Sequence, residues 1–254
     1  MRIKIILLSL LLSSLVNANT LPKDPLESVM WEFTRDKFIG DAPYVFDPQI
    51  KVLMPSFAED PLQVPVTVDA TALGERVKKV VVWSDLNPIQ HILSFEPLAG
   101  AQSKFSFRFK VQQATPVRAA VLTDDGVWHM GGDWLEAAGG GCTAPSMGSG
   151  LAEWEFSLGE TQQRLFGYND VMRYKMHIVH PMDTGLANGI PEFFIEQVEL
   201  RRQGDQQVIA KMAMSQPVSE NPVLTFDFAK TDEPLEVWLR DNNGNEFLSQ
   251  GAKL

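Results

Sequence analysis

The only cysteine of this chain, Cys142, lies within residues 137–150 (AAGGGCTAPSMGSG), a run of glycine and other small residues. Three consecutive glycines, Gly139, Gly140 and Gly141, come directly before it. Glycine has no Cβ atom and reaches most of backbone space, so a run of this kind is expected to be flexible and to pack poorly. Apolar, strand-like segments lie on both sides of the run. The sequence therefore predicts two folded modules joined by a mobile arm that exposes a thiol.

Residues 1–18 have the pattern of a secretory signal. Arg2 and Lys4 precede an apolar run, and the small residues that follow predict cleavage after Ala18 and a periplasmic location. The apolar run is shorter than the roughly 20 residues that span a membrane, and an uncleaved anchor is the alternative. An exported chain with one cysteine forms no internal disulfide, so its thiol is either used chemically or buried and inert.

The charge of the chain restricts its partners. Loss of residues 1–18 removes Arg2 and Lys4 and takes the net charge from −10 to −12. A chain this acidic is not expected to bind nucleic acid or an anionic membrane surface.

The sequence contains none of the common enzyme motifs, such as a G-x-S-x-G elbow, a phosphate-binding loop, H-E-x-x-H or C-x-x-C. Its four histidines are scattered, so we expect no metal site and no cofactor. His177 and His180 are three residues apart, which places them on opposite faces of a strand. His129 precedes the arm and is a candidate base for Cys142, whereas His91 has no visible chemical context.

A thiol on a flexible arm is better suited to carrying a group than to catalysis. A flexible arm offers little to lower the pKa of the cysteine, and only the thiolate is nucleophilic. An extended arm of five residues reaches about 17 Å, which is enough to enter the cleft of a partner enzyme. The pattern therefore favours a covalent carrier without catalytic machinery of its own.

The best helical candidate is residues 26–39 (LESVMWEFTRDKFI). Its apolar residues Leu26, Val29, Met30 and Phe33 recur at helical spacing. We expect an amphipathic helix that packs on the first module through this face.

The rest of the chain has the alternation and the turn signals of short strands. Residues 104–112 (KFSFRFKVQ) place Phe105, Phe107 and Phe109 on one face, and Asp124-Asp125-Gly126 is typical of a hairpin turn. Similar segments continue to the end of the chain, without the β-α-β alternation of a parallel sheet. The sequence therefore predicts an all-β protein of two antiparallel β-sandwiches. The expected division is a signal at 1–18, a first sandwich with its helix at 19–136, the cysteine arm and linker at 137–167, and a second sandwich at 168–254.

Several motifs connect the chain to a known family. Residues 58–60 (AED), residues 64–68 (VPVTV) and Asn87-Pro88 precede Gly140-Gly141-Cys142 in the first half. The most specific segment of the second half consists of His180, Pro181, Met182, Asp183, Thr184 and Gly185. By these motifs the chain resembles SoxY and SoxZ, the two subunits of the periplasmic sulfur carrier of bacterial thiosulfate oxidation, fused in one polypeptide.

The resemblance implies two immunoglobulin-like sandwiches packed together, with Cys142 as the covalent attachment site for a sulfur-containing intermediate. It implies no catalytic role for residues 180–185, which we interpret as a structural turn. In SoxY the cysteine lies almost at the free C-terminus, whereas here it is internal. The fusion also resembles SoxYZ-like proteins associated with quinoprotein dehydrogenases, which use pyrroloquinoline quinone. The expected partners are therefore Sox-type periplasmic oxidoreductases or such a dehydrogenase.

Two alternatives remain open from the sequence. The chain could be a non-covalent accessory subunit of a quinoprotein alcohol dehydrogenase, in which case binding survives loss of the thiol. It could also be a thiol enzyme, which requires a base such as His129 beside Cys142.

Overall fold

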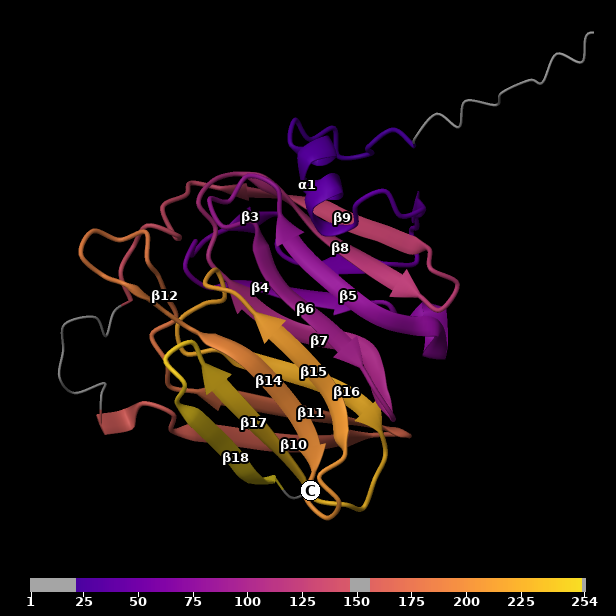
Figure 1. Cartoon of the computed structure of the whole chain (residues 1–254), viewed down its shortest axis with the longest axis vertical. Helices are drawn as coiled ribbons and strands as arrows, with labels where there is room; N and C mark the ends of the chain where they lie inside the picture. The colour runs from indigo at the N-terminus through magenta and orange to yellow at the C-terminus, as the bar shows by residue number, and fades with distance from the viewer. Residues whose placement is uncertain (1–21, 147–155, 253–254) are drawn as a thin grey trace, which may run out of the picture.

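The computed structural model describes residues 22–146 and 156–252 of the chain, and it confirms an all-β fold with a short helix near its N-terminal end (Figure 1). In this described part, no helix is long and apolar enough to cross a membrane. The first half contains α1 (Trp31–Phe38), β1 (Tyr44–Phe46), β2 (Lys51–Leu53), β3 (Phe57–Ala58), β4 (Val64–Asp69), the 3-10 helix η1 (Thr71–Arg76), β5 (Val77–Ser84), β6 (His91–Pro97), β7 (Ala101–Phe109), β8 (Thr115–Thr123) and β9 (Trp128–Ala137). The second half contains β10 (Thr161–Tyr168), β11 (Val171–Ile178), β12 (Asp183–Thr184), β13 (Glu192–Phe193), β14 (Ile195–Arg202), β15 (Val208–Met214), β16 (Val223–Ala229), β17 (Leu235–Asp241) and β18 (Glu246–Ala252).

Two large sheets run through both halves of the chain. The ten-stranded sheet has the order β1-β9-β8-β5-β6-β15-β14-β17-β18, with β3 also paired to β9. The six-stranded sheet has the order β10-β11-β16-β7-β4-β2, and β12 and β13 form a separate two-stranded sheet. The halves meet where β6 pairs with β15 and where β7 pairs with β16. The two sandwiches are therefore joined edge to edge, and their strands form continuous sheets across the junction (Figure 1).

The core between the two sheets follows from alternation along strands such as β4 and β7. On β7 the buried side chains are Phe105, Phe107 and Phe109, and on β4 they are the valines at 64, 66 and 68. Side chains of a strand alternate between its two faces, so β4 and β7 give every second residue to the core. β5 and β8 are buried on both faces, because a second apolar cluster that includes Trp31 of α1 covers their outer face. Phe105 lies 4.4 Å from Phe95, ring centre to ring centre, and Phe95 lies 6.3 Å from Phe226 of the second half. One apolar cluster thus crosses the junction between the halves.

The structure shortens the predicted linker. The segment predicted as arm and linker, residues 137–167, includes most of β10, which begins at Thr161 and forms an edge of the six-stranded sheet. Along β10 partly buried and exposed residues alternate weakly, so its sequence lacks the apolar face that would have marked it as a strand.

The prediction for the N-terminal helix is wrong in its length and in its buried face. The helix α1 has eight residues, and it buries Trp31 and Thr34, while Val29 and Phe33 are 91% and 57% exposed. The chain that precedes α1 forms turns instead of helix, because the Asp24 carboxylate accepts hydrogen bonds from the backbone N–H groups of Leu26 and Ser28. These bonds hold residues 24–28 in turns, so the helix begins only at Trp31.

A buried charged cluster attaches this segment to the sheet. Arg118 of β8 is 1% exposed, and its guanidinium donates to both carboxylate oxygens of Asp24 at 2.8 and 2.7 Å and to Asp85 at 3.0 and 3.1 Å. The same guanidinium lies 4.5 Å from the ring of Trp31, and Trp83 donates its indole N–H to Asp85. Burial raises the pKa of Asp24, but the hydrogen bonds from Arg118 and from the backbone outweigh it, so the pKa lies below its ordinary value.

Replacement of Arg118 by methionine should destabilise the protein strongly. Asp24 and Asp85 would then remain buried without a cation, which typically costs about 3–5 kcal/mol of unfolding free energy. Urea unfolding followed by tryptophan fluorescence measures the loss. The control is Arg240→Met, because Arg240 is 45% exposed and lies 4.0 Å from Glu196, so its loss should cost at most about 1 kcal/mol. Equal stabilities of the two variants would contradict the role of Arg118.

Candidate functional site

Cys142 is fully buried, and the segment that carries it is docked along the body of the protein. After β9 the chain turns through Gly139 and Gly140, which both have positive φ. The backbone N–H of Gly140 donates to the carbonyl of Gln112 at 3.1 Å, and that of Gly141 donates to the carbonyl of Val111 at 2.9 Å. We refer to residues 139–146 as the cysteine segment. The prediction of a mobile arm with an exposed thiol is wrong for the structure described here.

Two of the three glycines before the cysteine, Gly139 and Gly141, are required by close packing rather than by mobility. A Cβ atom at position 141 would lie 2.2 Å from the carbonyl oxygen of Pro61 and 2.8 Å from that of Val111. One at position 139 would lie 2.3 Å from the carbonyl oxygen of Gln112. Two backbones approach each other here to a distance that only glycine permits. A glycine run in a sequence is compatible with a mobile segment and with close approach of two backbones. The sequence alone therefore led to the prediction of mobility, whereas the structure shows close approach.

Polar groups from both halves of the chain hold Cys142. Its thiol donates to the carbonyl of Lys110 at 3.5 Å, and its backbone N–H donates to Oε1 of Gln112 at 3.2 Å. From the second half, the Thr184 hydroxyl donates to the carbonyl of Cys142 at 2.7 Å. The cysteine therefore lies between the first half and a loop of the second.

That loop is the segment of residues 180–185, which the sequence singled out as a structural turn; its residues Asp183 and Thr184 form the short strand β12, paired with β13. It follows β11, and three of its residues, Met182, Asp183 and Thr184, contact the cysteine segment or its surroundings; we call them the clasp. The Asp183 carboxylate accepts hydrogen bonds from the backbone N–H and the hydroxyl of Ser146 at 3.0 and 3.2 Å. The carbonyl of Met182 accepts a hydrogen bond from the buried ammonium of Lys110. The turn thus closes over the cysteine, a role that sequence spacing alone could not reveal.

His180 shapes this turn and makes no described hydrogen bond to Cys142. Its Nδ1 accepts the backbone N–H of Met182 at 3.1 Å, and its Nε2 lies 3.6 Å from a carboxylate oxygen of Asp241. Burial lowers the pKa of His180 to about 4, so the ring is neutral near pH 7 and Nδ1 can accept. Met182 has a positive φ of 50°, which this hydrogen bond helps to hold.

The surroundings of Cys142 suppress its reactivity. Burial raises the pKa of the thiol to about 12, and the nearby Lys110 only partly opposes this effect. Burial also lowers the pKa of Lys110, against the influence of Asp183 and Cys142. Because only the thiolate is nucleophilic, the docked cysteine is chemically protected. Reaction at the sulfur requires the cysteine segment to leave the clasp.

The candidate base His129 is engaged elsewhere. Its Nδ1 lies 2.8 Å from Oδ2 of Asp47, near the start of β9, whereas Cys142 follows the other end of this ten-residue strand. Such a strand is about 30 Å long. His91 lies between the hydroxyls of Ser215 and Ser94 at 2.6 and 3.0 Å. Within residues 22–146 and 156–252, no group of three or more His, Cys, Asp or Glu side chains could hold a metal ion.

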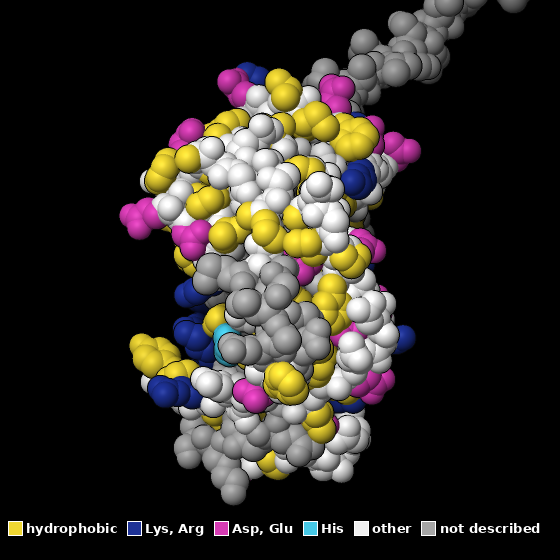
Figure 2. Space-filling model, turned by 90° about the vertical axis from the view of Figure 1, so that its left-hand side faces the viewer, with side chains coloured by type: hydrophobic (Ala, Val, Ile, Leu, Met, Phe, Trp, Pro, Cys, Tyr) yellow, Lys and Arg dark blue, Asp and Glu magenta, His cyan; other side chains and the backbone are white. Residues whose placement is uncertain are grey.

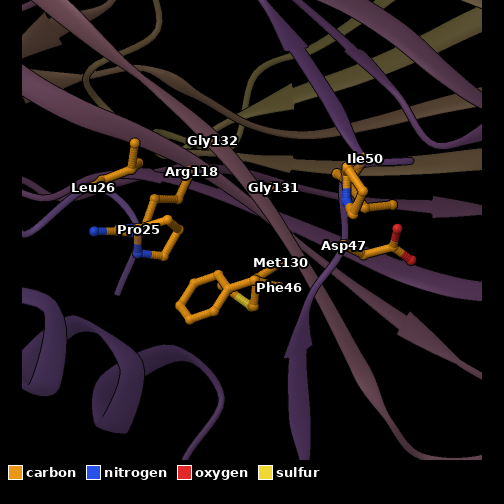
Figure 3. A pocket seen from close by; sticks show the side chains of 10 residues that line it. Pro25, Leu26, Phe46, Asp47, Ile50, Arg118, Met130, Gly131 and Gly132 are labelled. Atoms are coloured by element: carbon orange, nitrogen blue, oxygen red, sulfur yellow. The ribbon is translucent and has the colours of Figure 1, made fainter. Parts of the chain in front are cut away.

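A cavity of about 280 Å³ lies beside the N-terminal segment and is lined by residues that include Arg118, Met130, Gly131 and Gly132 (Figure 3). Its one guanidinium is already engaged by Asp24 and Asp85. A Cβ at position 131 would lie 2.5 Å from the carbonyl oxygen of Ile50, so this glycine serves packing. None of the lining residues belongs to the cysteine segment or the clasp.

Comparison with known proteins identifies both halves of the chain. Residues 35–142 match the family model of the sulfur oxidation protein SoxY, and residues 166–251 match that of the sulphur oxidation protein SoxZ. The chain therefore consists of a SoxY domain and a SoxZ domain in tandem. The SoxY match ends at Cys142, and the SoxZ match contains the clasp.

Other comparisons are less informative. No curated protein matches the chain. Among solved structures, the sulfur carrier protein SoxY from Chlorobium limicola f thiosulfatophilum matches with 17% identity and a TM-score of 0.38, over 43% of this chain and 96% of that one. A Parabacteroides merdae beta-glucuronidase matches with 7% identity and a TM-score of 0.25, over 80% of this chain and 24% of the enzyme. Both TM-scores are below 0.5, so we draw nothing from these likenesses.

Replacement of Gly141 by alanine should expose the thiol. The added Cβ cannot fit beside the carbonyl of Pro61, so the cysteine segment cannot dock and Cys142 should react with iodoacetamide at close to the rate of a free cysteine. Labelling at pH 8 followed by mass spectrometry measures this rate. The control is Gly204→Ala, where the added Cβ meets nothing within 4 Å and φ is not positive. Slow labelling of the Gly141 variant, as in the wild type, would show that the docked geometry is wrong.

Replacement of Thr184 by valine should loosen the clasp more mildly. The variant keeps the shape of the side chain but loses the hydrogen bond to the carbonyl of Cys142, and with it the local one that the hydroxyl accepts from the backbone N–H of Leu186. One hydrogen bond contributes about 0.5–1.5 kcal/mol, so the same labelling assay should give a roughly 2- to 10-fold faster rate. The control is Thr225→Val on the outer face of β16, which should label like the wild type. If the Thr184 variant also labelled like the wild type, the clasp would not restrain the cysteine.

Proposed function

We propose that this chain is a carrier protein that holds a sulfur-containing intermediate covalently on Cys142 and presents it to partner enzymes. The observation that carries the proposal is the position of the sole cysteine. It lies at the junction of the SoxY and SoxZ domains and is closed in by polar contacts from both of them. An inert structural cysteine would be packed among apolar side chains and would need neither three glycines nor a clasp.

The docked cysteine represents the protected state of such a carrier. Opening requires the loss of the hydrogen bond from Thr184 to Cys142, of the one from Cys142 to Gln112, and of the two from Ser146 to Asp183. At about 0.5–1.5 kcal/mol each, they hold the segment closed by a few kcal/mol. A partner enzyme that binds only the open form can supply a free energy of this size.

The chemistry on the sulfur belongs to the partners. Joining the Cys142 thiol to the sulfur of a thiosulfate-like substrate forms an S–S bond and releases two electrons and a proton, so an oxidoreductase must accept the electrons. The described contacts of Cys142 include no base that could activate it in place. We therefore assign no catalysis to the chain itself, and we expect no metal or other cofactor.

We place the carrier in the periplasm, on the strength of the signal-like residues 1–18. Its partners would be Sox-type oxidoreductases there. The fusion of the two domains, with an internal cysteine, points to a quinoprotein dehydrogenase as a further class of partner.

The intact mass of the protein purified from its native host without reductant tests the proposal. We expect a sulfur-containing adduct that peptide mapping places on Cys142, and we expect Cys142→Ser to fold normally but to lose both adduct and pathway activity. Thermal unfolding checks the fold, and Ser219→Ala serves as a control for substitution at a buried polar site. Full pathway activity of the Cys142→Ser strain would overturn the carrier role and leave the non-covalent accessory role.

A further inference from the structure

The outer face of the six-stranded sheet is basic on a chain whose net charge is −10. Residues at alternating positions of β7, β10 and β11, opposite to the core residues, point to this face. β10 and β11 are neighbours in the sheet, and β16 lies between β11 and β7. We define the basic face as Arg108 on β7, Arg164 on β10, and Arg173 and Lys175 on β11. All four side chains are exposed. In the space-filling view, dark-blue side chains gather along one side of the lower half, beside a histidine and protruding hydrophobic side chains (Figure 2).

Two of these cations directly oppose each other. In the antiparallel pair of β10 and β11, Arg164 is the register partner of Lys175. Directly opposed side chains have Cβ atoms about 4.5–5.5 Å apart, and like charges at such positions destabilise the sheet. Nearby, Asp227 is occupied by a two-fold hydrogen bond from Arg173 at 2.7 Å. In the described part of the chain, Arg108, Arg164 and Lys175 have no ion-pair partner.

The basic face adjoins the cysteine site. Arg108 is two residues before Lys110, whose carbonyl accepts the hydrogen bond of the Cys142 thiol. Lys175 belongs to β11, the strand that leads into the clasp at residues 182–184. From β10 to β7 the sheet spans three inter-strand spacings, or about 14 Å. A basic face of this width fits within the centre of an ordinary protein interface, which covers about 800 Å² on each partner.

We propose that the basic face is the docking surface for the partner enzyme, and that the partner presents an acidic protein surface to it. This inference rests on the proposed carrier function and specifies the partner of the same site. The cations of the basic face lower the stability of the free protein because they repel one another. Binding to anionic groups of another molecule would explain why they are present. Docking here would bring the partner beside the clasp, where the cysteine segment must emerge.

The shape of the face favours a protein over other anions. It is a pleated sheet surface rather than a cavity, so it does not enclose a small anion. Phe166 and Tyr168 are 46% and 76% exposed on the same face, and exposed aromatic side chains are typical of protein interfaces. An extended polyanion such as nucleic acid or an anionic membrane would also meet the acidic remainder of the chain and be repelled.

Binding of a short fluorescent poly-L-glutamate, which spans the basic face but does not reach the acidic remainder of the chain, tests the inference on the full chain as a model of an acidic protein surface. Fluorescence anisotropy at about 0.1 M salt is suitable, because charges more than about 10 Å apart are then largely screened and the local face dominates. We expect Arg164→Glu to weaken binding at least five-fold. The matched control is Lys78→Glu, an exposed lysine on β5 of the other sheet, which makes the same change in net charge.

The Arg164→Glu variant also separates binding from folding. It replaces a like-charge pair with an ion pair to Lys175, so the melting temperature should be unchanged or higher while binding falls. Equal loss of binding in the Lys78 and Arg164 variants would overturn the inference, because net charge alone would then account for it. Tighter binding of the wild type to vesicles with an anionic phospholipid, or to a single-stranded oligonucleotide, would overturn the assignment of a protein partner.

A further variant distinguishes failure of this inference from failure of the carrier function. Cys142→Ser should bind poly-L-glutamate like the wild type, because docking does not use the thiol. If Cys142 carries no sulfur adduct but Arg164→Glu still weakens binding, the docking surface is supported and the carrier role is contradicted. If the adduct is present but Arg164→Glu binds like the wild type, the carrier role is supported and the docking surface is contradicted.

Discussion

The pairing of β6 with β15 and of β7 with β16 is the constraint on which the rest of this structure depends. These two ladders fix the SoxZ domain against the SoxY domain, since they extend both sheets across the junction. The clasp comes from the second domain and the cysteine from the first, so their contact exists only because the ladders hold them in register. A hydrogen bond of 2.7 Å between Thr184 and Cys142 tolerates little sliding of one domain along the other.

The site shows how directional polar contacts can hold a reactive group in a buried position. The thiol donates to the main-chain carbonyl of Lys110, a threonine hydroxyl binds the backbone carbonyl of the cysteine, and burial keeps the thiol protonated. These contacts are individually weak and directional, so they can be broken in concert by a binding partner. Close packing of apolar side chains would hold the cysteine more permanently, because each buried methylene adds about 0.8 kcal/mol.

Sequence reasoning was reliable where the cause of a structure is local. The strands follow from alternation, as in the valines of β4, and the fold class follows from the number of such segments. It failed where the cause lies far away in the chain. The buried face of α1 is set by Arg118, more than 80 residues later, and the burial of Cys142 is set by the carbonyl of Pro61 and by Thr184. Nor could the sequence show that β6 and β15 complete one sheet, because strand edges carry no signal for a particular partner.

The continuous connection between the two domains has a consequence for how the cysteine is protected. In a carrier made of two separate subunits, dilution would separate the clasp from the cysteine and expose the thiol. In this single chain the two are tethered, and the closed fraction is set by an effective local concentration that does not change with the amount of protein. The burial of the thiol is therefore independent of the expression level. An organism could keep this carrier at very low abundance without exposing its cysteine sulfur.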